Sequence, residues 1–250
     1  MIDDTNHKAR VAFVTGAGGA LGAAIARALV DQGHRVVLGD NDAKTLASVA
    51  ATMGTNVLPI VFDVSDAAQV KNACDVARKT WGSVDILVNN AGILSNHKID
   101  DTTPEEWRRI HAVNLDGPYL LCRELVPAMR ERRWGRIINI CSLAMKTGGL
   151  TAGTAYTTSK GALGAFTFSL ARELAAHGVT ANGIAPAYIK TNMVTEQLNE
   201  QQRQELLRSI PVGRFCEPEE VAHAVVFLSS ALSGFITGEI VDINGGLHLD

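Results

Sequence analysis

Tyr156 and Lys160 lie four residues apart at the start of a helix-forming stretch that runs from Thr157 to Ala176. Because an α-helix places residues i and i+4 on one face, the phenol and the ammonium can share one proton-transfer site. A free tyrosine loses its proton at about pH 10, so it is a poor base at neutral pH unless a neighbouring positive charge stabilises the phenolate. Lys160 would supply that charge, and the pair could take a proton from an alcohol or return one to a ketone.

Two further polar residues could complete this site. Ser142 follows the apolar run Ile137 to Cys141, which predicts a central strand, so its hydroxyl could hold the substrate oxygen by a hydrogen bond. Asn114 lies in the stretch Glu105 to Arg132, which predicts a long helix. The alternative for both side chains is that they only bond local backbone, as Ser and Asn often do.

A glycine-rich segment follows the first predicted strand and precedes the Ala-rich helical stretch Ala23 to Val30. Glycines there allow a tight turn and let the backbone approach a pyrophosphate, whose charge the helix N-terminus stabilises. The alternative is a strand-to-helix turn that only packs closely. Its place after the first strand favours dinucleotide binding, and the residues expected to contact the cofactor are Gly16, Gly18, Gly19, Ala20, Leu21 and Gly22.

Asp40 ends the second predicted strand, where dinucleotide-binding folds place an acidic side chain that accepts hydrogen bonds from the adenosine ribose. A carboxylate there would repel the extra phosphate of NADP, and no Arg or Lys follows until Lys44. We therefore expect NAD as the cofactor, bound by Asp40 and Asn41, with NADP as the second choice. The alternative is a turn of Asp40, Asn41 and Asp42 that caps the helix beginning near Ala43.

Short β-branched runs alternate along the chain with longer stretches of helical period, which is typical of βαβ units. Right-handed crossovers pair such strands in parallel and place helices on both faces of the sheet. The sequence predicts an α/β fold, a doubly wound Rossmann-type three-layer sandwich with a parallel sheet of about seven strands. The expected strands are Val11 to Thr15, Val36 to Leu38, Val57 to Phe62, Ile86 to Val88, Ile137 to Ile140, Val179 to Ile184 and Ile240 to Ile243.

We expect one dinucleotide-binding and catalytic domain over residues 1–250, because no Pro/Ser-rich linker or repeat interrupts this alternation. The largest irregular region follows Pro186, and its helix-prone part, Thr195 to Ser209, is bracketed by prolines and a glycine. An insertion of this kind predicts a substrate lid within about residues 187–217.

Together these motifs resemble the short-chain dehydrogenase/reductase family over nearly the whole chain. The matching motifs, in family order, are Thr15 to Gly22 (TGxxxGxG), Asn89 to Gly92 (NNAG), Asn114, Ser142, Tyr156 to Lys160 (YxxxK), and Pro186 with Thr191. The chain departs from the family pattern at three small residues, Ala20, Cys141 and Ala187.

The resemblance implies a role for each matching residue. Asn114, Ser142, Tyr156 and Lys160 would be the catalytic residues, and Asn114 would position a water molecule that relays protons to Lys160. The cofactor would be bound by Asp63 and Val64 at the adenine, by Asn90 and Gly92 at the nicotinamide ribose, and by Ile189 and Thr191 at the carboxamide. Four further residues would also contact it: Ala91, Tyr156, Lys160 and Pro186. The family pattern also implies a homotetramer assembled through the two long helices, Glu105 to Arg132 and Thr157 to Ala176, and through the C-terminal segment.

The expected reaction interconverts a secondary alcohol and a ketone by hydride transfer to or from the nicotinamide, with Tyr156 as acid and base. Asp40 and NAD favour oxidation of a small polyol, sugar or hydroxy acid. A mostly apolar set should face the reacting carbon: Leu143, Met145, Gly149, Tyr188 and Met193.

Two other functions remain open. A 3-oxoacyl-(acyl-carrier-protein) or 3-oxoacyl-CoA reductase is one, since the chain resembles that branch and Arg132, Arg133 and Arg172 could meet an acidic carrier. Such reductases, however, resemble NADP enzymes with basic residues near the second strand. The other is a dinucleotide-sensing regulator without chemistry, which the intact Ser142, Tyr156, Lys160 and Asn114 disfavour.

The composition argues against several partners. A net charge of -3 and short basic clusters do not suit nucleic acid, and every apolar run is too short to cross a bilayer. The polar, acidic start of the chain lacks a signal segment, which predicts a cytoplasmic protein acting on a small molecule. Neither a CxxC pair nor an HExxH motif occurs, so we expect no metal site.

Overall fold

The computed structural model describes residues 9–190 and 200–249 of the chain. Within these residues, seven parallel strands form one sheet in the order β3-β2-β1-β4-β5-β6-β7. The strands are β1 (Val11–Thr15), β2 (Arg35–Asp40), β3 (Val57–Val61), β4 (Ile86–Asn89), β5 (Gly135–Ile140), β6 (Val179–Pro186) and β7 (Ile240–Ile243). The strand order and directions confirm the predicted doubly wound α/β fold.

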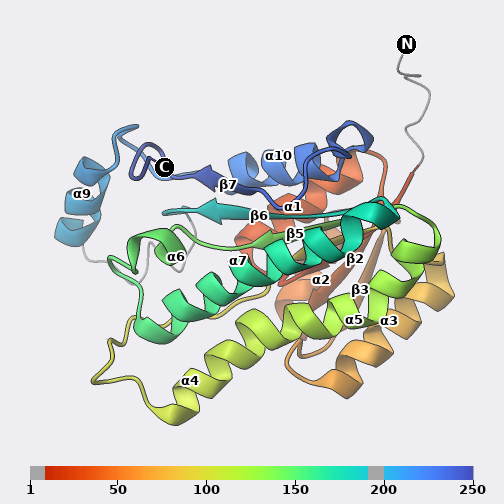
Figure 1. Cartoon of the computed structure of the whole chain (residues 1–250), viewed down its shortest axis with the longest axis horizontal. Coiled ribbons are helices and arrows are strands. Elements are labelled where there is room, and N and C mark those ends of the chain that lie inside the picture. The colour runs from red at the N-terminus through yellow and green to blue at the C-terminus, as the bar shows by residue number, and fades with distance from the viewer. Residues whose placement is uncertain (1–8, 191–199, 250) are drawn as a thin grey trace.

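Helices cover both faces of the sheet (Figure 1). On one face, α1 (Ala20–Asp31), α2 (Ala43–Ala51) and α10 (Pro218–Ser229) bury apolar side chains against the strands. On the other face, α3 (Ala67–Trp81), α5 (Gly117–Glu131) and α7 (Thr154–Leu174) cover a second apolar core. Because the central strands are buried on both faces, they consist of near-continuous apolar runs. Parallel pairing brings the carboxyl ends of all the strands to one edge, where ligands of such sheets bind.

The long helix predicted over Glu105 to Arg132 is divided. α4 (Pro104–His111) and α5 are joined by a π-helical turn, Ala112–Asp116, which carries Asn114. Single π-turns inside helices are frequent at functional sites. α7 begins at Thr154, before the predicted start at Thr157, because Gly153 serves as its N-cap. Tyr156 therefore lies in the first turn of α7.

The region after Pro186 is described only in part. α9 (Glu200–Ser209) forms the last two thirds of the helix predicted over Thr195 to Ser209, and residues 191–199 of the predicted lid lie outside the described residues. The other short elements are α6 (Ala144–Thr147) and the 3-10 turns Ala175–His177 and Ala231–Ser233. None of the helices in the described ranges has the length and apolar character that crossing a membrane requires.

A chain of buried polar side chains fixes α7 against the sheet. Asn89 Nδ2 on β4 donates to Asn139 Oδ1 on β5 at 2.8 Å, and Asn139 Nδ2 donates to Thr167 Oγ1 on α7 at 2.8 Å. Buried polar groups are costly to leave unpaired, so this chain of bonds specifies one lateral position for α7. The same helix carries Tyr156 and Lys160, which are thereby held relative to the strand ends.

Candidate active site

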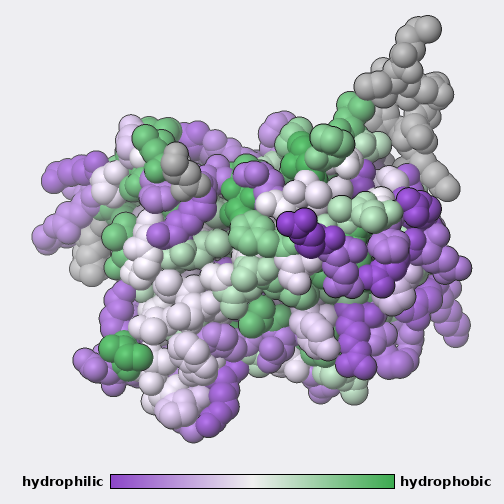
Figure 2. Space-filling model, in the orientation of Figure 1, coloured by the Kyte–Doolittle hydropathy of each residue, from purple (hydrophilic) through white to green (hydrophobic). Residues whose placement is uncertain are grey.

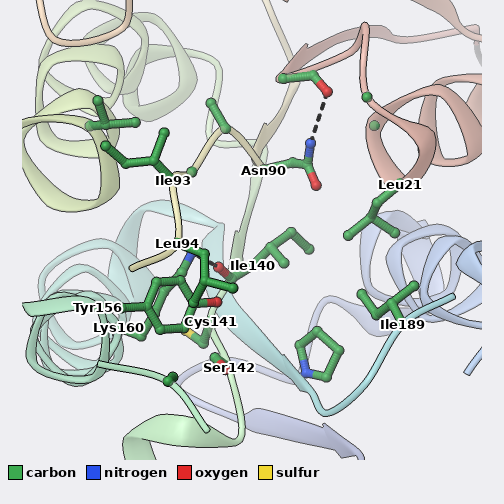
Figure 3. A pocket seen from close by; sticks show the side chains of 18 of the residues that line it. Leu21, Asn90, Ile93, Leu94, Ile140, Cys141, Ser142, Tyr156, Lys160 and Ile189 are labelled. Atoms are coloured by element: carbon green, nitrogen blue, oxygen red, sulfur yellow. Dashed lines mark hydrogen bonds between the residues drawn. The ribbon is translucent and has the colours of Figure 1, made fainter. Parts of the chain in front are cut away.

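A cavity of about 760 Å³ opens at the carboxyl edge of the sheet. Figure 3 shows Tyr156, Lys160 and Ser142 gathered on one side of it, with Leu21 and Asn90 across from them. Nearly all the predicted site residues line this cavity: Gly16, Gly18, Gly19, Ala20, Leu21, Gly22, Asp40, Asn41, Asp63, Val64, Asn90, Ala91, Gly92, Ser142, Tyr156, Lys160, Pro186 and Ile189. Thr191 lies outside the described residues.

Tyr156 and Lys160 lie together beside the end of β5. The Nζ atom of Lys160 is 5.8 Å from the centre of the Tyr156 ring and donates a 2.7 Å hydrogen bond to the carbonyl oxygen of Ile140. Lys160 is buried, and both Lys160 and Tyr156 line the cavity. The spacing of the two residues along α7 thus produces the shared site that the sequence predicted.

Burial controls the protonation of this pair. It raises the pKa of the Tyr156 phenol, and a hydrogen bond with Ser142 acts in the opposite direction. Burial also lowers the pKa of the Lys160 ammonium to about 8. The shift at Tyr156 is opposite to the one expected from a neighbouring ammonium, because loss of hydration disfavours the phenolate. At neutral pH the phenol keeps its proton and is ready to donate it.

Asn114 lies behind the cavity wall and has no exposed surface. Its Oδ1 accepts a 2.9 Å hydrogen bond from the Ile93 amide, and its Nδ2 donates to the Ile93 carbonyl and to Ser159 Oγ, each at 3.0 Å. A Cβ added to Gly92 would lie 3.2 Å from Asn114 Oδ1 and 3.4 Å from Lys160 Nζ. The absence of that side chain keeps the space between Asn114 and Lys160 open.

The glycine-rich segment makes a close turn between β1 and α1. Gly16 has φ of 65°, in the left-handed region that favours glycine. A Cβ on Gly22 would lie 2.1 Å from the carbonyl oxygen of Gly16, so only glycine allows α1 to approach the turn this closely. Ala20 and Ala187 both avoid positive φ, since Arg133 is the one non-glycine residue in the described ranges that adopts it. These features fit a pyrophosphate against backbone N–H groups and the start of α1.

Asp40 has a structural role beside this turn. Its carboxylate accepts hydrogen bonds from the Gly18 amide at 2.8 Å and from the Asp42 amide at 3.0 Å. Asp42 caps α2 by accepting from the amides of Lys44 and Thr45. The helix cap that was the alternative for this turn is therefore formed by Asp42, and Asp40 joins the glycine turn to the end of β2.

Asn90 joins the ends of β4 and β1. Its Nδ2 donates to the carbonyl oxygen of Thr15 at 2.8 Å, and the Thr15 hydroxyl accepts from the amides of Asn90 and Ala91. Asp63 holds the turn after β3, since its Oδ1 accepts from both the amide and the hydroxyl of Ser65. These bonds fix the floor of the cavity on the side of β1 to β4.

Part of the cavity wall could be identified only from the structure. It includes two groups of residues, one from the loop after β4 and the helical segment around α4 (Ile93, Leu94, Arg109 and Val113) and one from the segment before α7 (Leu150, Thr151 and Ala152). A smaller cavity of about 310 Å³ shares Ile93, Leu94 and Arg109 and extends to Ser95, Glu106 and Ile110. The spacing of Arg109 and Val113, four residues apart in a predicted helix next to Asn114, shows that they share a helix face but not that this face lines the cavity.

Several expected residues lie elsewhere. Leu143 and Tyr188 line the cavity as expected, whereas Met145 packs against Gly164 and the small cluster beneath α7. Arg132 pairs with Asp85 near the end of α5. Arg172 lies in the last turn of α7, about 24 Å along that helix from Tyr156. Neither arginine lines the cavity, so the contact with an acidic carrier would lie outside it and stays a prediction. Among the described residues, no group of three or more His, Cys, Asp or Glu side chains is placed to hold a metal ion.

Comparison with protein families gives a match over residues 16–248, to the family described as enoyl-(acyl carrier protein) reductase. The 3-oxoacyl-(acyl-carrier-protein) reductase FabG of Vibrio harveyi is 36% identical over 244 residues, which cover 98% of this chain and 99% of the relative. FabG of Escherichia coli K12 is 36% identical over 246 residues, with the same coverage. A crystal structure from Brucella melitensis, described as a short-chain dehydrogenase/reductase and glucose/ribitol dehydrogenase, matches with a TM-score of 0.91 and 33% identity, covering 96% of this chain and 97% of that one.

The expectation of NAD as the main cofactor is wrong. The sequence relatives are 3-oxoacyl-(acyl-carrier-protein) reductases, the class that resembles NADP enzymes. The inference failed at Asp40, whose two carboxylate oxygens bind the amides of Gly18 and Asp42. An acidic residue at the end of β2 can thus be retained to hold the backbone, and its presence alone does not identify the dinucleotide.

The reaction class does not depend on whether the cofactor is NAD or NADP. The match covers both the glycine turn and the Tyr156 to Lys160 motif, and the relatives extend over almost the entire chain. The protein is an NAD(P)-dependent oxidoreductase that acts on a CH–OH group or on the corresponding ketone. The chain therefore belongs to the short-chain dehydrogenase/reductase family.

Proposed function

We propose that the protein is a 3-oxoacyl-(acyl-carrier-protein) reductase, which reduces the 3-oxo group of an acyl thioester to a 3-hydroxy group with NADPH. The observation that carries this proposal is the near full-length similarity to two reductases of that name. The cavity supports it, because apolar side chains such as Ile93, Leu94 and Leu150 line its wall and suit an acyl chain.

Ser142, Tyr156, Lys160 and Asn114 would carry out the proton transfers. The Ser142 hydroxyl would donate a hydrogen bond to the 3-oxo oxygen, and Tyr156 would donate its proton to the same oxygen. When bound, the dinucleotide supplies the hydride that forms the new C–H bond at the carbonyl carbon. Lys160, with a water molecule held near Asn114, would return a proton from solvent to the Tyr156 phenolate.

The cofactor would lie across the ends of β1 to β6. The glycine turn, residues 16–22, would bind the pyrophosphate, and Asp63 and Val64 would line the adenine pocket. Asn90, Ala91 and Gly92 would contact the nicotinamide ribose, and Pro186, Ile189 and Thr191 would hold the nicotinamide. Support for this arrangement comes from the cavity, which reaches from Asp40 to Ile189.

Arg109 supports an anionic carrier or thioester. It lies on the exposed side of α4 and lines both the main and the smaller cavity. A guanidinium at this rim suits a phosphate or a carboxylate that enters beside the acyl chain. Arg132 and Arg133, in contrast, are bonded to Asp85 and to the carbonyl of Ala176 at the far ends of α5 and α7.

The proposal is tested by a substrate panel. Purified protein is assayed with NADPH and a 3-oxoacyl-(acyl-carrier-protein), and separately in the oxidative direction with polyols, sugars and hydroxy acids. Turnover of the thioester with the highest kcat/KM of the panel is expected. No turnover of the thioester, together with oxidation of a polyol or sugar, would refute the proposal.

A sugar or polyol dehydrogenase is the second candidate. The specific observation in its favour is the structural similarity to the Brucella melitensis protein described as a glucose/ribitol dehydrogenase. The same panel separates the two candidates, because a polyol has neither a long apolar chain nor an anionic carrier. Loss of activity in Arg109→Leu with the thioester only would support the first candidate.

We also propose a homotetrameric, cytoplasmic protein that folds as one domain. Tyr119 on α5 and Phe168 on α7 support assembly, since these aromatic side chains are 48% and 49% exposed on the helices expected to pair. Figure 2 shows green to white surface over α7 and the adjoining part of α5, whereas the surface over α3 is hydrophilic. Light scattering should give about four times the 26.6 kDa protomer mass. A monomer at micromolar concentration would exclude the tetramer.

A further inference from the structure

Two loops on the substrate side of the cavity are hydrogen-bonded to each other. One follows β4 and contains Ser95 and His97, and the other precedes α7. The Gly153 amide donates to the Ser95 carbonyl at 2.7 Å, and the Thr154 amide donates to the His97 carbonyl at 3.0 Å. A Cβ on Gly153 would lie 2.4 Å from the His97 carbonyl oxygen, so the two backbones are in close contact.

The side chain of Lys98 reinforces this contact. Its Nζ donates to the carbonyl oxygen of Gly149 at 2.8 Å and to that of Ala152 at 2.7 Å. The ammonium thus joins both ends of a four-residue turn, residues 149–152. Hydrogen bonds from a charged donor are stronger than those between neutral groups, so Lys98 restrains the turn more than backbone contacts alone would.

The turn that Lys98 holds is part of the cavity wall. Leu150, Thr151 and Ala152 line the main cavity, and Leu150 is 68% exposed at its mouth. The Thr151 hydroxyl lies 3.4 Å from the hydroxyl of Tyr188, which also lines the cavity. Since α7 begins at Thr154, the same turn leads directly into the helix that carries Tyr156.

We propose that Lys98 is a positioning residue, whose ammonium fixes the turn of residues 149–152 so that Leu150 and Thr151 form one wall of the substrate entrance. Lys98 does not line the cavity itself, so it acts through the turn and not by contact with the reacting atoms. This inference rests on the proposed function for the identity of the acyl substrate. The restraint on the turn does not depend on that function.

A lysine suits this position because its ammonium is compact and carries three donors, which can reach two carbonyl oxygens at once. Methionine has a similar length and apolar stem but no donor, so Lys98→Met removes the two bonds with little change in volume. Lys98→Arg keeps the charge and the donors. Lys79, an exposed lysine in the last turn of α3, provides the matched control variant Lys79→Met.

The first measurement is hydrogen exchange of the amides in residues 149–154 of the full-length protein. In Lys98→Met these amides should exchange faster, while in Lys98→Arg and Lys79→Met they should exchange at nearly the wild-type rate. Unchanged exchange in Lys98→Met would overturn the inference, whatever the substrate proves to be.

The second measurement is steady-state kinetics with a 3-oxoacyl-(acyl-carrier-protein) and NADPH. Loss of two charge-assisted hydrogen bonds should raise KM for the thioester by about tenfold in Lys98→Met. The value of kcat and the Kd for NADPH should change less than about threefold, because the chemistry and the cofactor contacts lie elsewhere. A fall in kcat with KM unchanged would contradict a positioning role. Absence of thioester turnover in the wild type would instead refute the proposed function and leave the exchange result to decide the role of Lys98.

Discussion

The ammonium of Lys160 lies 2.7 Å from the carbonyl oxygen of Ile140, the last residue of β5. This bond anchors the Lys160 side chain to the strand end that leads to Ser142. With burial lowering the pKa of Lys160 to about 8, its proton is held weakly enough to be exchanged near neutral pH. The end of the central strand thus fixes the positions of both the Ser142 hydroxyl and the Lys160 ammonium.

This relationship predicts a pH dependence. In the proposed mechanism reduction uses a protonated Lys160, so kcat/KM should fall as the pH rises through about 8. Lys160→Arg keeps the charge at higher pH because the guanidinium does not titrate there, so its remaining activity should lose this descending limb. A pH–rate profile of both proteins is the measurement. A wild-type rate that stays flat to pH 10 would contradict the proton role of Lys160.

Lys160 should also affect stability. Its pKa is lower in the folded protein than the ordinary lysine value of about 10.5, so the unfolded chain binds more protons between pH 8 and 10.5. Below pH 8, burial of the charged Lys160 destabilises the folded state. This destabilisation decreases as the pH rises from about 8 to 10.5. Urea titrations of wild type and Lys160→Met should show that the stabilising effect of the substitution shrinks from pH 7 to pH 10.5. An equal difference at both pH values would count against a depressed pKa.

Gly22 should not tolerate alanine. The added Cβ would lie 2.1 Å from the Gly16 carbonyl oxygen, which forces α1 away from the turn. We expect Gly22→Ala to lower stability by about 1–3 kcal/mol and to weaken dinucleotide binding. Gly161→Ala on α7 is the control, because a Cβ there meets nothing within 4 Å and alanine favours the helix. Chemical denaturation that finds both variants equally stable would mean that the close turn is not required.

The negative charge of Asp40 should weaken the binding of NADPH. Asp40→Asn keeps an oxygen that can accept from the Gly18 amide but removes the negative charge next to the adenosine end of the cavity. The Kd for NADPH should therefore fall several-fold, since the 2′-phosphate no longer faces a carboxylate. Fluorescence titration with NADPH measures it. Weaker NADPH binding in this variant would indicate that Asp40 is needed mainly to hold the turn.

The sequence was informative wherever local spacing determines geometry. The β-branched runs predicted every strand of the described sheet to within a few residues, and the spacing of Tyr156 and Lys160 placed both on one helix face. The π-turn at Asn114 could not be predicted, because a single extra residue per turn leaves no periodic signal. The bonds from Lys98 to the 149–152 turn join residues about fifty positions apart and arise only from the tertiary fold.

Asp40 illustrates the limit of inference from one residue type. A carboxylate at a strand end can bind a ribose or hold backbone amides, and both uses need the same residue at the same position. Asp40 and Gly18 are 22 positions apart and belong to no common motif. The hydrogen bond between them forms only because β1 and β2 pair side by side.

The measurement that tests the account most directly is kcat for a 3-oxoacyl-(acyl-carrier-protein) with NADPH in wild type and in Tyr156→Phe. The phenylalanine ring preserves the packing and removes the proton donor, so kcat should fall by about 10²–10⁴-fold while the Kd for NADPH stays unchanged. Retention of kcat within a few-fold of wild type would show that Tyr156 is not the acid of the reaction.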